Sequence, residues 1–450
     1  MQEITRVRFE ALAAYCRKPE ALVFAEEVGW FQVSDEKLLI VLIRDRPDND
    51  FSAIVLAKDL KERYRWVSMT DFYESPEEAL SASKENIREI SRNLDAVGEQ
   101  GDEVGKSVDF FSPVVLRGKL NKDFICLTTL EEYSPALELI KPMMRWYEDA
   151  DGNFVEQFQT TGFDARIWEL YVFAVLIELG YVLDRTVAIP DFVARGVLGD
   201  LCVEATTVNP TLDKRGRPAI PPPLETWEDN TAYQCEYMPI KFAGPLTAKL
   251  AKKYWERSNV KGLPLIFAIQ DFHAPMSMTM TRAGLPIYLY GYAYDWNRDW
   301  DGTLVLSPRK VVSHKWGGKE VPSGFFGIPG AENVSAVISN TSATISKFNR
   351  IGLMAGFGSK RVHMIRRGFA ADFDPNAFAP RPFVKDVSQS EYSESWVEGM
   401  DVYHNPFAKY PLDPSFIPGA AHHRLLDGGK IESFVPSWQP LTSFTHITLT

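Results

Sequence analysis

The chain has 450 residues, of which 45% are hydrophobic, and a formal net charge of −11. This length and apolar content suffice for a large buried core divided into two or three domains, and no apolar run approaches the about 20 residues that a membrane span needs. The negative charge excludes a protein that coats nucleic acid by bulk electrostatics, although local basic patches can still contact phosphates.

The start of the chain and its cysteines indicate a cellular compartment. Residues Met1 to Arg6 lack the basic end and apolar centre of a signal peptide. The four cysteines are scattered without a redox or zinc-binding spacing. We therefore expect a cytoplasmic protein with reduced thiols, no zinc site and no membrane partner.

Residues 1–105 predict a separate α+β domain. Strand-like stretches at 37–45, 51–58 and 65–73 are followed by an amphipathic helix from Ser75 to about Leu94, which indicates a three-stranded meander capped by one helix. No catalytic motif occurs here, so we expect contacts with a partner protein or a second copy of the chain. The polar, glycine-containing stretch 98–106 is typical of a linker, and the chain from about residue 108 is predicted to fold without this domain.

Residues 106–350 predict an α/β core that contains one long insertion. A helix is expected around Glu169, and strands are expected at 263–271, 287–293 and 334–344. The insertion at 208–239 lies in a stretch with six prolines, so it is either a flap over a substrate cleft or disordered. Gly244 and Pro245 should then open a helix that runs to about Arg257. Residues 351–450, rich in aromatics and turns, predict an extended, loop-rich tail packed on the core.

Two acidic residues are predicted to face each other across a β-hairpin. The stretches 192–195 and 201–207 flank Gly196 and Gly199, a bracket typical of a tight turn. If these glycines are opposed, the successive pairs are Arg195 with Asp200, Ala194 with Leu201, Val193 with Cys202, Phe192 with Val203 and Asp191 with Glu204. The first pair has opposite charges, and every pair between it and the carboxylates is apolar. Since Val197 and Leu198 suit a two-residue turn poorly, a slipped register or a looser loop is the alternative.

Paired carboxylates at this position indicate a cation. Like charges directly across a ladder repel, and oxygen ligands favour Mg²⁺ or Mn²⁺. Asp191 after a proline is also typical of a turn, and Glu204 of a strand-end surface charge. Glu169, the third acidic candidate, lies three positions after Arg166 on a helix, so an ordinary ion pair explains it as well.

These residues lie in three segments that resemble the PD-(D/E)xK, or restriction-endonuclease-like, nuclease superfamily. The segments are Phe163-Asp-Ala-Arg-Ile-Trp-Glu-Leu-Tyr171, Pro190-Asp191-Phe192 and Val203-Glu204-Ala205-Thr206. The resemblance covers roughly a third of the chain and implies a restriction-endonuclease-like mixed sheet built as helix, three strands, helix and strand. It also implies that Glu169, Asp191 and Glu204 occupy the family's acidic positions.

The family's lysine is missing, because Thr206 occupies its place. Either the lysine has migrated or activity is lost. The helix after the hairpin offers Lys249, which shares a face with Lys253, whereas Lys241 lies just before that helix. Lys249 and Lys241 are the candidate replacements.

The first functional hypothesis is a Mg²⁺- or Mn²⁺-dependent nuclease, and a DNA endonuclease is favoured over an RNA nuclease. Bacterial defence against phage is the setting that the resemblance suggests. The alternative is a degenerate nuclease fold that binds nucleic acid or protein, and Thr206 favours it. Six basic residues between Lys347 and Arg367 are a candidate phosphate-binding surface, with a solvated surface as the alternative, while His404, His422 and His423 lack a recognisable carboxylate partner.

Overall fold

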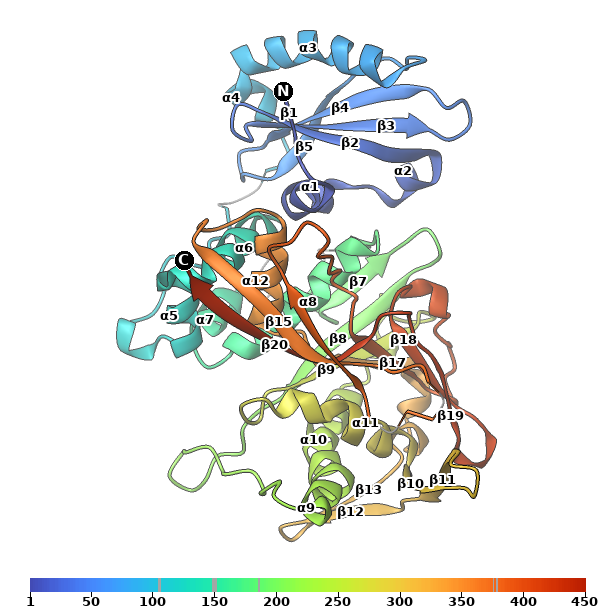
Figure 1. The fold of residues 1–450 in the computed structure, drawn as a ribbon. Coiled ribbons are helices and arrows are strands. Elements are labelled where there is room, and N and C mark those ends of the chain that lie inside the picture. Colours follow the sequence, from blue (N-terminus) through green and yellow to red (C-terminus); the bar gives the residue numbers. More distant parts are fainter. Residues whose placement is uncertain (104–106, 148–151, 185–186, 375, 378) are drawn as a thin grey trace.

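An eight-stranded mixed sheet organises most of the chain. The computed structural model describes residues 1–103, 107–147, 152–184, 187–374, 376–377 and 379–450 (Figure 1). The strand order is β19-β18-β17-β14-β9-β8-β7-β6. Strands β8, β9 and β14 are mutually parallel, and β6 to β8 form an antiparallel meander. The strands are β6 Val182–Leu183, β7 Phe192–Arg195, β8 Leu201–Val208, β9 Leu265–Asp271, β14 Ala336–Asn340, β17 Met400–His404, β18 Ala421–Leu425 and β19 Ile431–Phe434.

Helices cover both faces of this sheet, so the core has three layers. Alternate residues of β9 enter two different apolar clusters: Ile266 and Ala268 pack with one set of helices, and Leu265 and Phe267 with the other. The first set is α6 Ser134–Trp146, α8 Phe163–Glu178 and α12 Ile345–Met354, and the second is α10 Met238–Leu250 and α11 Thr281–Tyr290. The protein is therefore of the mixed α/β class, as expected.

The N-terminal unit has more strands than the sequence indicated. Its antiparallel sheet has five strands in the order β1 to β5, because β1 Gln2–Glu3 and β2 Ala25–Val33 precede the predicted meander of β3 Leu38–Asp45, β4 Phe51–Lys58 and β5 Tyr64–Met69. Helix α3, Pro76–Arg92, covers one face and begins at Ser75, whose side chain accepts a hydrogen bond from the Glu78 amide. The unit also contains α1 Arg6–Ala13, α2 Pro19–Phe24 and α4 Leu94–Gly98.

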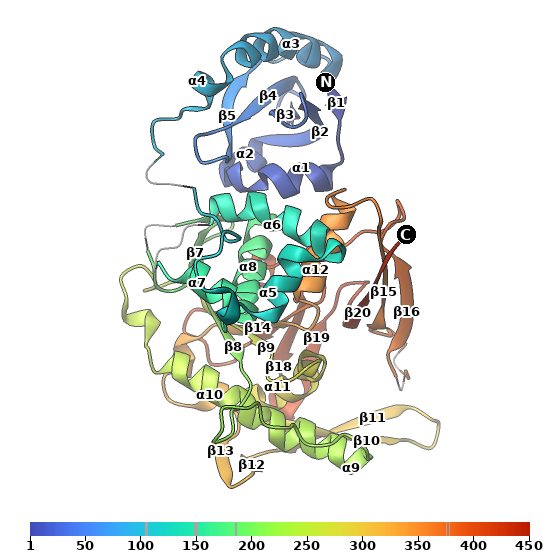
Figure 2. The ribbon, with the colours of Figure 1, turned by 90° about the vertical axis from the view of Figure 1, so that its left-hand side faces the viewer.

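Helix α1 joins the N-terminal sheet to the core. It lies between that sheet and α6 (Figure 2), and the apolar cluster that contains Phe9 of α1 also contains Leu39 of β3 and Leu139 of α6. Arg8 donates to the Ala355 carbonyl at 2.9 Å. The prediction that residues 108–450 fold alone was based on the polar linker and did not take these contacts into account. It stays a prediction. Residues 104–106 of that linker lie outside the described residues.

The segment after β8 differs from the prediction in where its helix begins. Only residues 209–226 are irregular, since α9 Trp227–Ala232 leads through a π-helical turn, Tyr233–Tyr237, into α10. Pro245 therefore lies inside α10 rather than opening it, and α10 ends at Leu250 rather than near Arg257. Pro239 lies in the first turn of α10, directly after the π-helical turn.

The predicted strand at 287–293 is wrong. Its apolar residues form the last turn of helix α11, which ends at Tyr290. Gly291 follows in a left-handed conformation, and β10 begins only at Tyr292. A short apolar run fits a buried helix as well as a strand. Two exposed hairpins follow, β10 Tyr292–Arg298 with β11 Leu304–Lys310 and β12 Ser313–Trp316 with β13 Lys319–Pro322.

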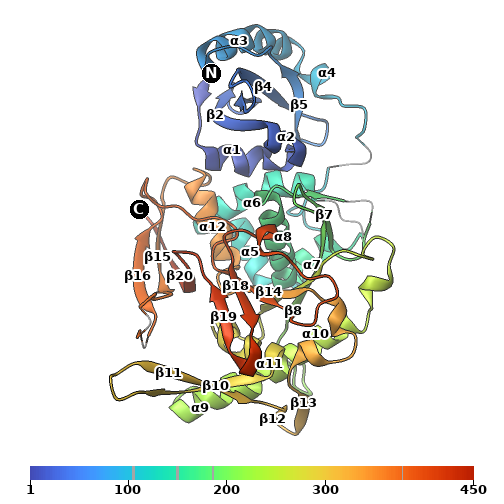
Figure 3. The ribbon, with the colours of Figure 1, turned by 90° about the vertical axis from the view of Figure 1, so that its right-hand side faces the viewer.

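The C-terminal hundred residues are not an extended tail. They supply β17, β18 and β19 to the central sheet, and β15 Val362–Ala370, β16 Arg381–Asp386 and β20 Pro440–Leu449 form a second sheet beside α12 (Figure 3). Because the strands are short and separated by turn-forming dipeptides, they were not recognised as strands from the sequence. This part does pack on the core, as expected.

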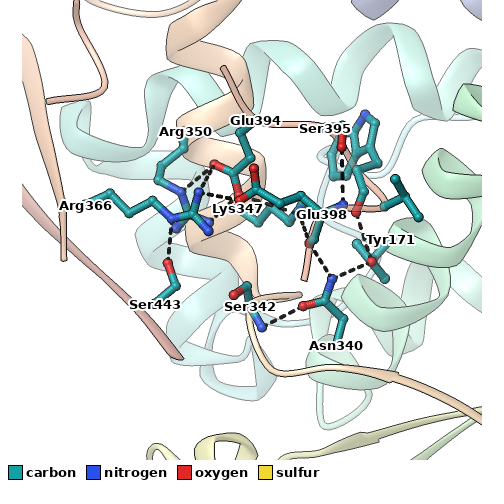
Figure 4. A network of polar contacts seen from close by, with 12 residues as sticks. Tyr171, Asn340, Ser342, Lys347, Arg350, Arg366, Glu394, Ser395, Glu398 and Ser443 are labelled. Carbon is teal, nitrogen blue, oxygen red and sulfur yellow. Dashed lines mark hydrogen bonds and ion pairs between the residues drawn. The ribbon is translucent and has the colours of Figure 1, made fainter. Parts of the chain in front are cut away.

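A buried ionic network fastens this C-terminal part to α12. Glu394 receives two hydrogen bonds from Arg350 of α12, at 2.7 and 2.8 Å, and lies 3.5 Å from both Lys347 and Arg366 (Figure 4). Arg366 donates to Glu398 at 2.7 Å. Three of the six basic residues that suggested a phosphate surface are therefore buried among acids, and those three do not form one.

Two more helices pack on the same side of the core, α5 Lys122–Thr129 against α6 and α7 Phe154–Gln159 against α8. Among the described residues, no helix combines the length and apolarity needed to cross a bilayer.

Candidate functional site

The hairpin has the predicted register. Phe192 pairs with Val203, and Ala194 pairs with Leu201. The turn closes through a bond of 3.1 Å from the Gly199 amide to the Gly196 carbonyl, with Gly199 at φ +138°. The predicted ion pair of Arg195 with Asp200 is replaced, because Arg195 binds Asp184 beyond β6 at 2.7 Å.

Asp191 and Glu204 meet at the end of this hairpin. The Asp191 amide donates to Glu204 Oε2 at 3.2 Å, and Asp191 Oδ2 accepts a bond of 2.7 Å from the Ala205 amide. Each carboxylate thus caps the backbone of the opposite strand. The arrangement brings together the two acids that the sequence paired.

The pKa of Asp191 is raised well above its ordinary value. Burial is the largest cause, and the charges of Glu204 and Glu169 add to it, whereas Lys249 and the Ala205 amide oppose the shift. Crowded carboxylates of this kind favour a positive partner. A pKa shift caused by burial together with specific neighbouring charges is also typical of functional sites.

Lys249 supplies a positive charge beside the pair. Its ammonium binds Glu204 Oε1, and the same oxygen accepts a bond of 2.6 Å from the Tyr254 hydroxyl. Lys249 is on α10, which covers the sheet face toward which Glu204 points. Thr206, two residues after Glu204 on β8, leaves the lysine position of the motif without a charge.

Lys241 is elsewhere on α10. Its ammonium donates to the Thr211 hydroxyl at 2.7 Å and lies over the Tyr237 ring at 5.4 Å. Burial lowers its pKa, and Asp271 opposes that shift. Eight residues separate it from Lys249, about 12 Å along a helix. Of the two predicted replacements, only Lys249 contacts the carboxylate pair.

Glu169 approaches from the opposite side of the sheet. Helix α8, which carries it, packs on the face away from α10. The Tyr147 hydroxyl and the Arg166 guanidinium both bind its carboxylate. Glu169 raises the Asp191 pKa, so the two charges interact, but its oxygens are already engaged. The ion pair with Arg166 that the helical spacing suggested is present.

The donor set for a metal ion is therefore two carboxylates. Within the described ranges, no three His, Cys, Asp or Glu side chains are grouped closely enough to hold one ion. Glu169 thus does not complete a three-carboxylate cage. Two carboxylates nevertheless suit Mg²⁺, which keeps several waters and often takes substrate phosphates as ligands. Asp191 and Glu204 have the ligand chemistry for such an ion, which would have to share Glu204 with Lys249, Tyr254 and the Asp191 amide.

Basic residues are concentrated in the segment that begins with Lys249. Residues 249–261 contain five basic residues and one acidic residue, Glu256, although the whole chain is acidic. Lys252, Lys253, Arg257 and Lys261 are exposed. Of these, the charge of Arg257 acts on Tyr254, whose hydroxyl binds Glu204.

The irregular segment 209–226 covers a cavity of about 710 Å³ next to α10. Asn209 and Pro222 line it from one side, and Lys241 and Trp316 line it from the other. None of Asp191, Glu204 and Lys249 lines this cavity, so the flap over a substrate cleft stays a prediction.

The sequence reasoning missed several polar contacts. Tyr147 and Tyr254 bind the two glutamates, but a single tyrosine in a sequence carries no signal of such a role. His423 does have a carboxylate partner, Asp401, at 3.0 Å, while His404 and His422 bind each other at 2.9 Å. Asp401 lies on β17, whose strand character was not recognised.

Comparison with protein-family models, with curated proteins and with solved structures finds no match to this chain.

Proposed function

We propose that the protein is a divalent-metal-dependent phosphodiesterase that cleaves nucleic acid, with DNA favoured over RNA. The observation that carries this proposal is the placement of Lys249 from α10 on Glu204, beside Asp191. A carboxylate pair with an adjacent ammonium is the set of charges that phosphodiester hydrolysis requires.

The order of elements supports a restriction-endonuclease-like core. Helix α8, strands β6 to β8, helix α10 and strand β9 follow one another as helix, three strands, helix and strand, with β9 parallel to β8. Glu169 lies on the helix, Asp191 directly before the second strand and Glu204 on the third strand. In this proposal, the lysine has migrated from the position of Thr206 to α10.

Each residue then has a defined role. Asp191 and Glu204 would hold the ion, which when bound supplies electrostatic polarisation of the scissile phosphate. Lys249 would stabilise the negative charge that develops on the phosphate in the transition state. Tyr254 orients the Glu204 carboxylate through its hydrogen bond of 2.6 Å. Glu169, held by Arg166 and Tyr147, adds negative charge that strengthens cation binding.

The basic residues that follow Lys249 support a nucleic-acid substrate. Binding to phosphates depends on local lysine and arginine rather than on net charge. Lys252, Lys253 and Arg257 are exposed on the segment that follows Lys249 and carries Tyr254. Substrate binding through them should weaken steeply with increasing salt.

A matched pair of lysine variants tests the proposal. Lys249→Met and Lys241→Met each remove one ammonium from the same helix, but only Lys249 contacts Glu204. With supercoiled plasmid and Mg²⁺ or Mn²⁺, we expect cleavage to fall about 10²- to 10³-fold for Lys249→Met. Lys241→Met should cleave at nearly the parent rate. Absence of cleavage by the parent on DNA and RNA with either metal would contradict the proposal.

The alternative is a nuclease fold that now only binds nucleic acid or protein. Thr206 favours it, because a threonine leaves no ammonium at the family's usual position. A protein that retards DNA in a gel without cleaving it in either metal would support this second function.

A further inference from the structure

A second large cavity lies between the N-terminal unit and the core, away from the carboxylates. Its volume is about 710 Å³, within the range of pockets for small ligands. Val41 and Leu56 of the N-terminal sheet form one wall, and Tyr15 lies beside them. Trp146 and Val182 close it from the core side.

The mouth of this cavity exposes apolar side chains that the fold does not cover. Leu22 is 40% exposed, Trp66 58% and Val182 39%. Tyr15 stacks on Trp146, with ring centroids 6.5 Å apart. Aromatic walls and an apolar mouth favour a ligand with a flat, apolar body.

Positive charges outnumber negative charges in the lining. Four basic residues face two acidic ones, namely Arg17, Lys18, Arg63 and Arg65 against Glu27 and Asp102. Arg17 is held by Glu27 at 2.6 Å, and Arg63 by Asp59 at 2.7 Å. Arg65 binds Asp102 at 3.1 Å and lies 3.6 Å from the buried Asp59, and the Asp102 side chain is 59% exposed. Since an exposed carboxylate contributes little free energy to such a pair, a ligand anion can replace Asp102 on Arg65 while Asp59 stays in place.

We propose that this cavity binds a small organic anion with a flat apolar or aromatic body and one anionic group. The body lies against the apolar wall of Val41 and Leu56, beside Tyr15, and the anionic group binds the Arg65 guanidinium. Neither part of this proposal depends on the phosphodiesterase proposal, because no residue of the carboxylate site lines the cavity.

Two fluorescent probes test the two parts of the proposed ligand. Anilinonaphthalene sulfonate has an aromatic body and one anionic group, and phenylnaphthylamine has the same rings without charge. Titrating the full chain with the sulfonate should give saturable binding of one molecule per chain, with energy transfer from tryptophan. Arg65→Gln should weaken binding of the sulfonate about tenfold and leave binding of the amine within about twofold.

Two further variants serve as the filling mutant and the control. Ala21 is exposed on α2 and lines the cavity, so Ala21→Trp should block both probes at little cost in folding stability. Arg44 lies on the same sheet, pairs with Glu26 at the surface and does not line the cavity. Arg44→Gln should bind both probes like the parent.

Three results would overturn the proposal. One is the absence of saturable sulfonate binding by the parent below about 1 mM. Another is unchanged binding in Ala21→Trp, which would place the probe elsewhere. The last is an equal loss of sulfonate binding in Arg65→Gln and Arg44→Gln, which would show that binding depends on the overall charge of the protein rather than on Arg65.

Discussion

Replacing Glu394 with glutamine should destabilise the protein more than any surface charge change. Glu394 is the carboxylate that Arg350, Lys347 and Arg366 share in the buried network (Figure 4). The parent network contains three buried cations against Glu394 and Glu398. Glu394→Gln preserves shape but leaves one buried carboxylate for three cations.

The expected cost follows from burial. Burial alone would raise the Glu394 pKa, but the charges of Arg350, Arg366 and Lys347 outweigh it and hold the pKa well below 4.5. Breaking a buried pair from one side costs about 3–5 kcal/mol, a large share of the about 5–15 kcal/mol that stabilises a domain. Since the folded-state pKa is depressed, this stabilisation is present above pH 4.5 and is lost as the pH falls through the folded-state value.

Equilibrium unfolding in urea at pH 7 measures this cost. Glu131→Gln is the matched control, because Glu131 pairs with Arg361 at 2.9 Å but at the surface, and it should cost less than about 1 kcal/mol. Adding Lys347→Met to Glu394→Gln removes one excess cation and should recover at least about 1 kcal/mol. A cost for Glu394→Gln no larger than that of the control would refute the reasoning.

Three further predictions concern the site and the N-terminal unit. Asp191→Asn should abolish cleavage yet stabilise the fold by about 0.5–2 kcal/mol at pH 7. Because the folded-state Asp191 pKa is raised, the parent loses stability as the pH rises through that pKa. The stability advantage of the variant, measured in urea, should therefore grow from about pH 4 to about pH 8. Tyr254→Phe removes the hydrogen bond that orients the Glu204 carboxylate, so it should lower the cleavage rate about tenfold, but the carboxylate remains and Mn²⁺ should still bind. A cleavage rate equal to the parent's would show that Tyr254 has no role in the site. Residues 108–450 alone should melt at a lower temperature than the whole chain, because Phe9 no longer covers α6, and equal melting temperatures would show that α1 adds nothing.

The hairpin was predictable because its signals are local. Glycines at 196 and 199 bracket two apolar stretches, and only one register keeps every intervening pair apolar. That register determined the meeting of Asp191 and Glu204. The helical spacing likewise predicted the ion pair of Glu169 with Arg166.

Features that depend on distant parts of the chain were not predictable. Lys249 and Lys241 looked alike in the sequence, and only the packing of α10 on the sheet brings one of them to Glu204. The basic residues Lys347, Arg350 and Arg366 read as a surface patch because their acidic partners come from residues 394 and 398. Tertiary contacts of this kind leave no short-range pattern.

The strand errors have a similar cause. The run 287–290 is apolar at every position and so carries no period that separates a helix from a strand. Strands β17 to β19 have four or five residues each and become strands only by pairing with β14 and with one another. The sequence therefore predicted the centre of the sheet better than its edge.

Calorimetric titration with Mn²⁺ tests the central claim most directly. The parent protein should bind Mn²⁺ at a site that both Asp191→Ala and Glu204→Ala abolish, while circular dichroism shows an intact fold. Lys249→Met should still bind the ion, because it removes a cation rather than a ligand. If both alanine variants bind Mn²⁺ like the parent, the carboxylate pair is not a metal site and the account is wrong.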